Sequence, residues 1–210
     1  MTARYPLAEA AHAAGTLDDL DAVRAWRTDP EGDEPAPDGD ALRDAMKRRT
    51  SVRRYGTGRL SVAQVKELLA WSEAPIPADA PRVVEQIVTV AAVDGLEPGI
   101  YDARLNLLHS RAEQEVRERA GFAAMEQDHP RDAAVNVFQL AELEKVVAGL
   151  GDRGYRWAQL EAGIRAGRLQ VGAFVRGWGA AASTFYDEEV SRFLETSAAP
   201  MLMVAIAPRR

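Results

Sequence analysis

The feature that most constrains the fold is a pair of apolar runs lying far apart in the chain. The run VVEQIVTVAAV, residues 83–93, is rich in β-branched residues, and PMLMVAIAP, residues 200–208, has the same apolar character. Such runs are typical of buried strands. Helical patterns lie between them, so we expect one sheet whose last strand returns from the C-terminal region, as in an α+β or α/β fold.

Helix signals precede and separate these runs. Ser61 and Gln64 have the spacing of an S-x-x-Q capping box, and the helix they open ends at Ala74 before a proline-rich stretch. The other expected elements are a helical segment over 1–28 with Thr16 as a cap, helices over 41–48, 111–125, 155–178 and 186–195, and a strand over 99–110. Residues 132–141 are expected to form a second central strand or a passage from strand to helix.

The stretch TDPEGDEPAPDGD, residues 28–40, combines prolines, glycines and acids, which predicts an exposed linker. We therefore expect an N-terminal helical arm with its acidic linker over 1–40. A single domain of ordinary size then follows over 41–210.

Composition excludes several classes of function. A net charge of −6 argues against nucleic acid or a membrane surface as a partner, and no apolar run approaches the length of a membrane helix. With no recognisable signal peptide, we expect a cytoplasmic protein. Cysteine is absent, and the three histidines, His12, His109 and His129, lack metal-ligand spacing, so we expect no metal site.

Positive charge is concentrated in RRTSVRRY, residues 48–55, although the chain is acidic. In an extended segment Arg49, Ser51 and Arg53 would share one side, and two guanidiniums with a hydroxyl suit a phosphate. The alternative is a basic helix end, where the arginine charges interact favourably with the negative C-terminal end of the helix dipole.

Two later motifs allow similar alternatives. GDRGYRWAQLEAG, residues 151–163, opens a helix with aromatic residues suited to a planar ligand or a subunit contact, or simply to the core. RGWGAAASTFYDEEVSRFL, residues 176–194, offers small residues for a close ligand approach, or a helix end at Gly177 or Gly179 followed by a buried strand.

In this order the segments resemble the nitroreductase superfamily and, within it, the SagB-type dehydrogenases, which oxidise azolines to azoles in ribosomally made, modified peptides. The resemblance covers residues 44–208. It is carried by RRTSVRRYGTGRLSVAQVKELLAWSEAP, which is similar to the opening R-x-S-x-R segment and first helix, by VDGLEPGIYDARLNLLHS, and by GDRGYRWAQLEAG.

The resemblance implies a nitroreductase-like α+β fold, with a central, mostly antiparallel sheet flanked by helices, and an intertwined dimer. It also implies FMN at the subunit interface. The family pattern assigns the flavin phosphate to the opening segment and the flavin ring to the region that reads STFYD here. The implied cofactor-binding residues are Arg49, Ser51, Arg53, Ser183, Thr184 and Arg209.

Departures from the family pattern fall at flavin and catalytic positions. Ile76 stands where the family has a serine, and Ile164 stands where it has a histidine. The family's Gln-Asn pair falls on Gly167 and Arg168, and the Lys-Tyr pair that carries base catalysis falls on Gly149 and Leu150. A positioned base contributes roughly 10²–10⁴ in rate. The remaining candidates for that role are Tyr155, Glu161 and Asp152.

Three functions follow from this pattern. The first is an FMN-dependent, SagB-type oxidoreductase acting on a peptide or small metabolite in a natural-product tailoring pathway, as a homodimer or as a heterodimer with a related subunit. The second is a flavin-poor or flavin-free relative kept as a partner or scaffold. The third is a general NAD(P)H-dependent nitro- or quinone reductase.

Overall fold

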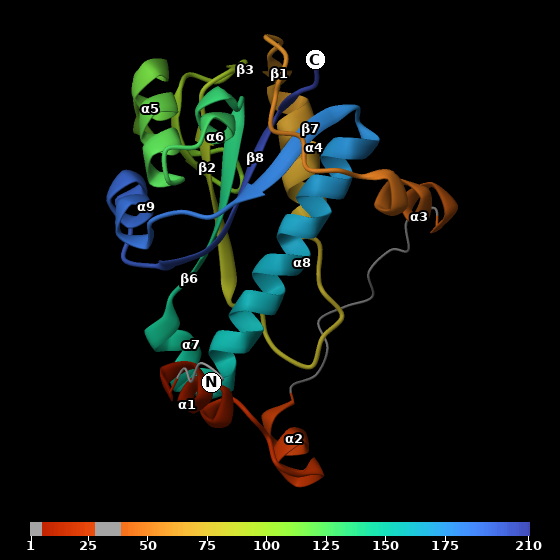
Figure 1. Cartoon of the computed structure of the whole chain (residues 1–210), viewed down its shortest axis with the longest axis vertical. Coiled ribbons are helices and arrows are strands. Elements are labelled where there is room, and N and C mark those ends of the chain that lie inside the picture. Colours follow the sequence, from red (N-terminus) through yellow and green to blue (C-terminus); the bar gives the residue numbers. More distant parts are fainter. Residues whose placement is uncertain (1–5, 28–38) are drawn as a thin grey trace, which may run out of the picture.

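A computed structural model describes residues 6–27 and 39–210, and its centre is a six-stranded sheet (Figure 1). The strands lie in the order β5-β4-β2-β6-β8-β7, and every neighbouring pair is antiparallel. The strands are β2 (Val84–Val90), β4 (Gly99–Asp102), β5 (Leu107–Ser110), β6 (Val135–Ala141), β7 (Trp178–Ser183) and β8 (Ala199–Pro208). The expected α+β fold with a mostly antiparallel sheet is confirmed.

Helices cover both faces of this sheet: α4 and α8 pack on one face, and α5 and α9 pack on the other (Figure 1). Two short strands, β1 (Leu60–Ser61) and β3 (Val93–Asp94), pair in parallel beside it. The helices are α1 (Pro6–Ala14), α2 (Leu20–Trp26), α3 (Gly39–Arg48), α4 (Val62–Glu73), α5 (Glu113–Ala123), α6 (Asp128–Asp132), α7 (Leu143–Leu150), α8 (Arg153–Val175) and α9 (Asp187–Leu194). None of these helices is both long enough and apolar enough to cross a membrane.

The core is built around β6, in which every residue is buried. Strands β2 and β8 flank it, and helices cover both faces, so neither side of β6 meets water. This is why its sequence is an apolar run with few polar interruptions. The polar side chains within it are hydrogen-bonded at one atom each: Asn136 donates to the Pro130 carbonyl at 3.0 Å, and Gln139 accepts from Gln86 at 3.2 Å. Asn136 Oδ1 and Gln139 Nε2 are buried without a hydrogen-bond partner among the described residues.

Several expected boundaries are confirmed by local geometry. Ser61 and Gln64 form the capping box of α4, with both reciprocal hydrogen bonds present. Gly177 has φ +75°, which stops the long helix and lets Trp178 begin the small-residue strand β7. The structure therefore agrees with the helix-end interpretation of residues 176–194, with the end at Gly177, and a close approach of a ligand to this segment stays a prediction.

Other expectations were wrong. The run over 83–93 is not one strand, because β2 ends at Val90 and the chain then turns into β3. The N-terminal arm is two helices, and the cap of α2 is Asp19, whose carboxylate accepts from the Ala22 N–H, whereas Thr16 bonds back to the His12 carbonyl. Helix α7 was not among the elements expected from the sequence. Most of the expected linker, residues 28–38, lies outside the described residues, so the division at residue 40 stays a prediction.

A buried ion pair fixes α8 to the sheet. Arg165 and Glu161 are 2% and 1% exposed, and their charged atoms are 2.7 Å apart. The second carboxylate oxygen of Glu161 accepts the backbone N–H groups of Val83 and Val84 at 2.8 and 3.1 Å, at the start of β2. Arg165 also donates to the Ser72 carbonyl in α4 at 3.3 Å, so one pair joins α8, α4 and β2.

We predict that Glu161→Ala destabilises the fold by about 3–5 kcal/mol, because it removes the nearer carboxylate partner of the buried charge of Arg165 and leaves only Glu73, at 3.5 Å. The matched control is Glu67→Ala, which removes the exposed partner of Arg176 and should cost about 0–1 kcal/mol. Urea-induced unfolding followed by circular dichroism measures both. Equal, small losses would show that the buried pair does not fix α8.

Candidate functional site

The basic segment that follows α3 forms an extended strip along the outer edge of the sheet. Val52 donates its backbone N–H to the carbonyl of Ala180 in β7 at 2.9 Å. Tyr55 forms an antiparallel bridge with Arg209, just beyond β8. The buried Tyr55 hydroxyl donates to the Ala205 carbonyl at 3.1 Å, and burial raises the pKa of Tyr55 far above its ordinary value. The strip is therefore anchored to the sheet at Val52 and at Tyr55.

Close packing under the strip depends on a glycine. A Cβ on Gly179 would lie 2.7 Å from the Val52 side chain and 3.0 Å from the Tyr55 ring, which no ordinary side chain tolerates. While Tyr55 is buried and Val52 half-buried, Ser51 and Arg53 stay exposed. The extended interpretation of this segment therefore agrees with the structure.

The helix-end interpretation applies to Arg48, the last residue of α3. Its guanidinium pairs with the carboxylate of Asp44, one turn earlier, at 2.5 Å. It also lies 6.0 Å from the centre of the Phe174 ring in α8, so the charge of Arg48 is already engaged.

The other cations of the site keep their charge available for a ligand. Arg49 donates to the neutral amide oxygen of Gln170 in α8 at 2.8 Å. The Arg209 guanidinium lies 5.5 Å from the centre of the Phe174 ring. Across residues 6–27 and 39–210, Arg49, Arg53 and Arg209 form no ion pair with a carboxylate. The structure thus brings Arg53 and Arg209 to one end of the strip and holds Arg49 on α8.

A hollow of about 430 Å³ opens beside Arg49, between α3 and the outward face of α8. This volume is within the ordinary range for ligand pockets. Arg49 and Gln170 lie in its wall together with apolar side chains, so an anionic group and an apolar ring could be accommodated side by side. The lining residues are Leu42, Met46, Arg49, Trp71, Ile164, Gly167, Arg168, Gln170 and Val171.

Ser183 and Thr184 lie at the end of β7, where Thr184 is exposed and Ser183 is buried. The Ser183 hydroxyl is 2.5 Å from Nε2 of buried His129 in α6. Burial lowers the pKa of His129, and the nearby positive charge of Arg53 lowers it further, against a smaller opposite effect of Asp128 and Asp132. Sequence reasoning missed His129, because a lone histidine far from Ser183 in sequence carries no signal of this contact.

The three candidate bases lie away from this group within one chain. Tyr155 is half-exposed and Asp152 is exposed at the start of α8, about 22 and about 27 Å along the helix from Gln170 at 1.5 Å per residue. The carboxylate of Glu161 is occupied by Arg165 and by backbone N–H groups. A catalytic role for these residues stays a prediction. Nor do the described residues include a group of three or more acids or histidines placed to hold a metal ion.

A family model described as "Nitroreductase family" matches residues 46–207, which is most of the chain. The chain therefore belongs to the nitroreductase family. A curated protein of Methanocaldococcus jannaschii, named as a nitroreductase, is 26% identical over 178 residues, which cover 79% of this chain and 89% of that protein.

Solved structures agree with the fold. A nitroreductase structure from Anabaena variabilis aligns with a TM-score of 0.74 at 24% identity over 88% of this chain, and this chain spans 41% of that one. The E. coli microcin synthetase McbBCD complex, solved with truncated pro-MccB17 bound, aligns with a TM-score of 0.62 at 13% identity, over all of this chain and 84% of that one. At such identities the likeness shows the fold alone.

We predict that the protein loses stability as the pH falls below about 6.5. The unfolded histidine binds a proton near that pH, whereas burial keeps the pKa of His129 lower in the folded state. The stabilisation is full above pH 6.5 and is lost as the pH falls towards the folded-state pKa.

Urea unfolding between pH 8 and pH 5 measures this loss. The variant His129→Asn should show a shallower decline, because it removes the titrating group and retains an amide that can bond Ser183. A decline of unchanged steepness in that variant would assign the pH dependence to other groups.

Proposed function

We propose that this protein is an FMN-dependent oxidoreductase whose flavin phosphate is held by Arg49, Ser51 and Arg53, with Arg209 as a further contact. One observation carries the proposal: the basic strip is anchored in an extended form, and its cations are not neutralised by carboxylates. Guanidiniums match phosphate oxygens with paired hydrogen bonds, and a serine hydroxyl adds a donor, so these residues fit a phosphate dianion.

When bound, FMN would supply a two-electron acceptor for hydride transfer. The chain's own residues would bind and orient it. Gln170 holds the Arg49 side chain in place, and Phe174 does the same for Arg209, so less conformational freedom is lost on binding. The family pattern places Ser183 and Thr184 toward the flavin ring, where the exposed Thr184 offers a hydroxyl.

The finer proposal is a SagB-type dehydrogenase that removes hydrogen from an azoline in a peptide or small metabolite. The GDRGYRW segment supports it, as does the likeness in fold to a subunit of a microcin synthetase complex. The partner is a second copy or a related subunit. Apolar side chains exposed along α8 support such an interface, namely Tyr155, Leu160, Ile164 and Val175.

A second candidate is a flavin-free partner or scaffold subunit. It is favoured by Gly149 and Leu150, which supply no proton-transfer group where a Lys-Tyr pair is expected, and by Ile76 in place of a serine. A general NAD(P)H-dependent nitro- or quinone reductase is the third candidate, and no separate observation favours it.

We predict that the purified protein is yellow and that Arg53→Ala weakens FMN binding by at least about tenfold, since a charge-assisted hydrogen bond contributes roughly 1.5–3 kcal/mol. The control is Arg59→Ala, because Arg59 already pairs with Asp94 at 2.7 Å. Flavin absorbance and equilibrium titration measure occupancy. Colourless protein that takes up no added FMN would contradict the proposal and favour the scaffold subunit.

The dehydrogenase proposal predicts that flavin-loaded protein converts an azoline-containing peptide to the azole, with loss of two hydrogen atoms measured by mass spectrometry. Reduction of quinones or nitroarenes by NADPH, with no azole formed, would support the third candidate instead. Loss of azole formation in Arg53→Ala, restored by excess FMN, would connect the activity to the phosphate contact.

A further inference from the structure

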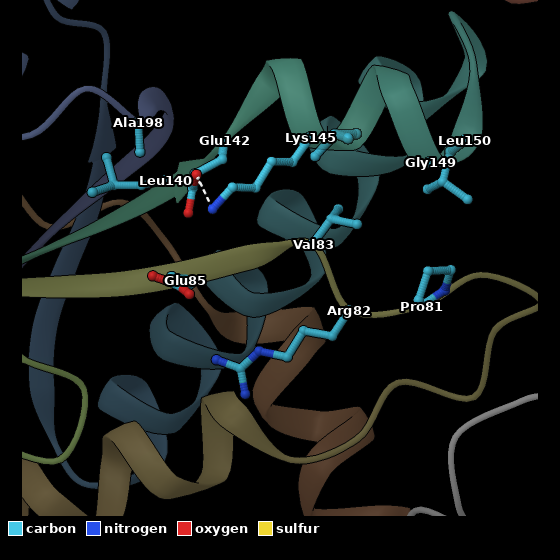
Figure 2. Close-up of a pocket in the computed structure, with 11 residues that line it drawn as sticks. Pro81, Arg82, Val83, Glu85, Leu140, Glu142, Lys145, Gly149, Leu150 and Ala198 are labelled. Carbon is cyan, nitrogen blue, oxygen red and sulfur yellow. Dashed lines mark ion pairs between the residues drawn. The ribbon is translucent and has the colours of Figure 1, made fainter.

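A second cavity lies at the other end of α8 from the basic strip, between α7, the start of β2 and the residues just before β8 (Figure 2). Its volume is about 280 Å³, at the small end of ligand pockets. Apolar side chains make most of the wall, and four charged residues complete it. The apolar and small residues are Pro81, Val83, Leu140, Val146, Gly149, Leu150 and Ala198.

Two of the four charged residues lie on β2 or just before it. The side chain of Arg82 is directed away from Glu142 and Lys145 in Figure 2. Its guanidinium pairs with Glu73 and donates to the Val84 carbonyl at 3.1 Å. Its charge is therefore compensated. Glu85 is exposed and forms no ion pair with any residue in 6–27 or 39–210.

The other two belong to the start of α7. Lys145 lies 2.5 Å from the carboxylate of Glu142, and the two form the ion pair drawn in Figure 2. The hydrogen bond that Lys145 donates to the Glu142 carboxylate raises the pKa of Lys145, and the charge of Glu85 raises it a little more, so the ammonium stays protonated. The ammonium of Lys145 is thus paired with Glu142 alone, and Glu85 leaves the cavity with one uncompensated negative charge.

The open side of the cavity is set by a glycine. A Cβ built on Gly149 would have no atom within 4 Å, so the missing side chain is what leaves this space unfilled. Two indole groups donate hydrogen bonds to backbone carbonyls of the lining: Trp26 to Leu150 at 3.0 Å, and Trp157 to Pro81 at 2.6 Å. The end of α7 and the segment before β2 are therefore each fixed by a tryptophan.

We propose that this cavity binds a small organic cation, an amine with an apolar body, with its charge on Glu85 and its body against Leu140, Val146 and Leu150. Charge complementarity selects the cation, because both basic residues of the lining are already paired and Glu85 is not. The volume limits the body to about the size of one aromatic ring with a short chain. The cavity shares no lining residue with the hollow beside Arg49, so amine binding can be measured separately from FMN binding. Gly149 and Leu150 in its wall stand where the family pattern has the Lys-Tyr pair.

The test uses three probes of matched shape on the full chain: 2-phenylethylamine, neutral 2-phenylethanol and anionic 3-phenylpropionate. Calorimetry gives the affinity, and nuclear magnetic resonance of the indole N–H groups gives the place. We expect the amine to bind most tightly and to shift the signals of Trp26 and Trp157, while those of Trp71 and Trp178 stay unchanged. Failure of the amine to bind, or tighter binding of the anion, would overturn the proposal.

Variants with opposite expected effects test the role of charge. Glu85→Gln should weaken amine binding by roughly three- to tenfold, since it replaces a charge-assisted contact by a neutral one. Lys145→Gln should strengthen it, because it removes the competing ammonium. If Lys145→Gln instead weakens binding, the cavity recognises an anion and the proposal is wrong.

A substitution that fills the cavity tests where the amine binds. Gly149→Phe should abolish amine binding, and Gly163→Phe is the matched control, because Gly163 is also exposed with no atom near its Cβ and lies outside the cavity lining. Thermal unfolding shows whether both variants fold. Unchanged binding in a folded Gly149→Phe protein would place the amine elsewhere and overturn the proposal.

Discussion

The position of α8 depends on the buried contact between Glu161 and Arg165, and both proposed ligand sites depend on the position of α8. The ion pair holds the helix to the start of β2 and to α4. Because both side chains are buried, loss of either one would leave a buried charge without its nearest partner and lower the stability of the fold. Toward its C-terminal end α8 presents Gln170 and Phe174 to the arginines of the strip. Toward its N-terminal end Trp157 supports the wall of the second cavity. One long helix thus sets the separation of the two sites.

Much of the fold follows from signals that are local in sequence. The capping box at Ser61 and Gln64 and the positive φ of Gly177 each fix an element boundary within a few residues. The apolar runs that became β6 and β8 are explained by burial on both faces. The expectation of one strand over 83–93 was wrong because the residues after Val90 are apolar and buried although the chain has left the six-stranded sheet.

The candidate site was only partly predictable, because its contacts join residues far apart in the chain. Period-two spacing suggested that Arg49, Ser51 and Arg53 share one side, and the resemblance to a family suggested why. Nothing local indicated that Gln170 would hold Arg49, or that His129 would meet Ser183. Such pairs are decided by how α8 and α6 pack on the sheet. The absence of a side chain at Gly149 was visible in the sequence, whereas the cavity beside it was not.

The bond between Val52 and Ala180 has a consequence for solubility. Strand β7 is the last strand of the sheet, and an outermost strand with open backbone groups can recruit another chain and start aggregation. The strip occupies part of that border and places cationic side chains outside it, which repel a second copy of the same segment. A change that detaches the strip would therefore expose the open backbone groups of β7 and remove the cationic side chains beside them, so we expect the protein to precipitate.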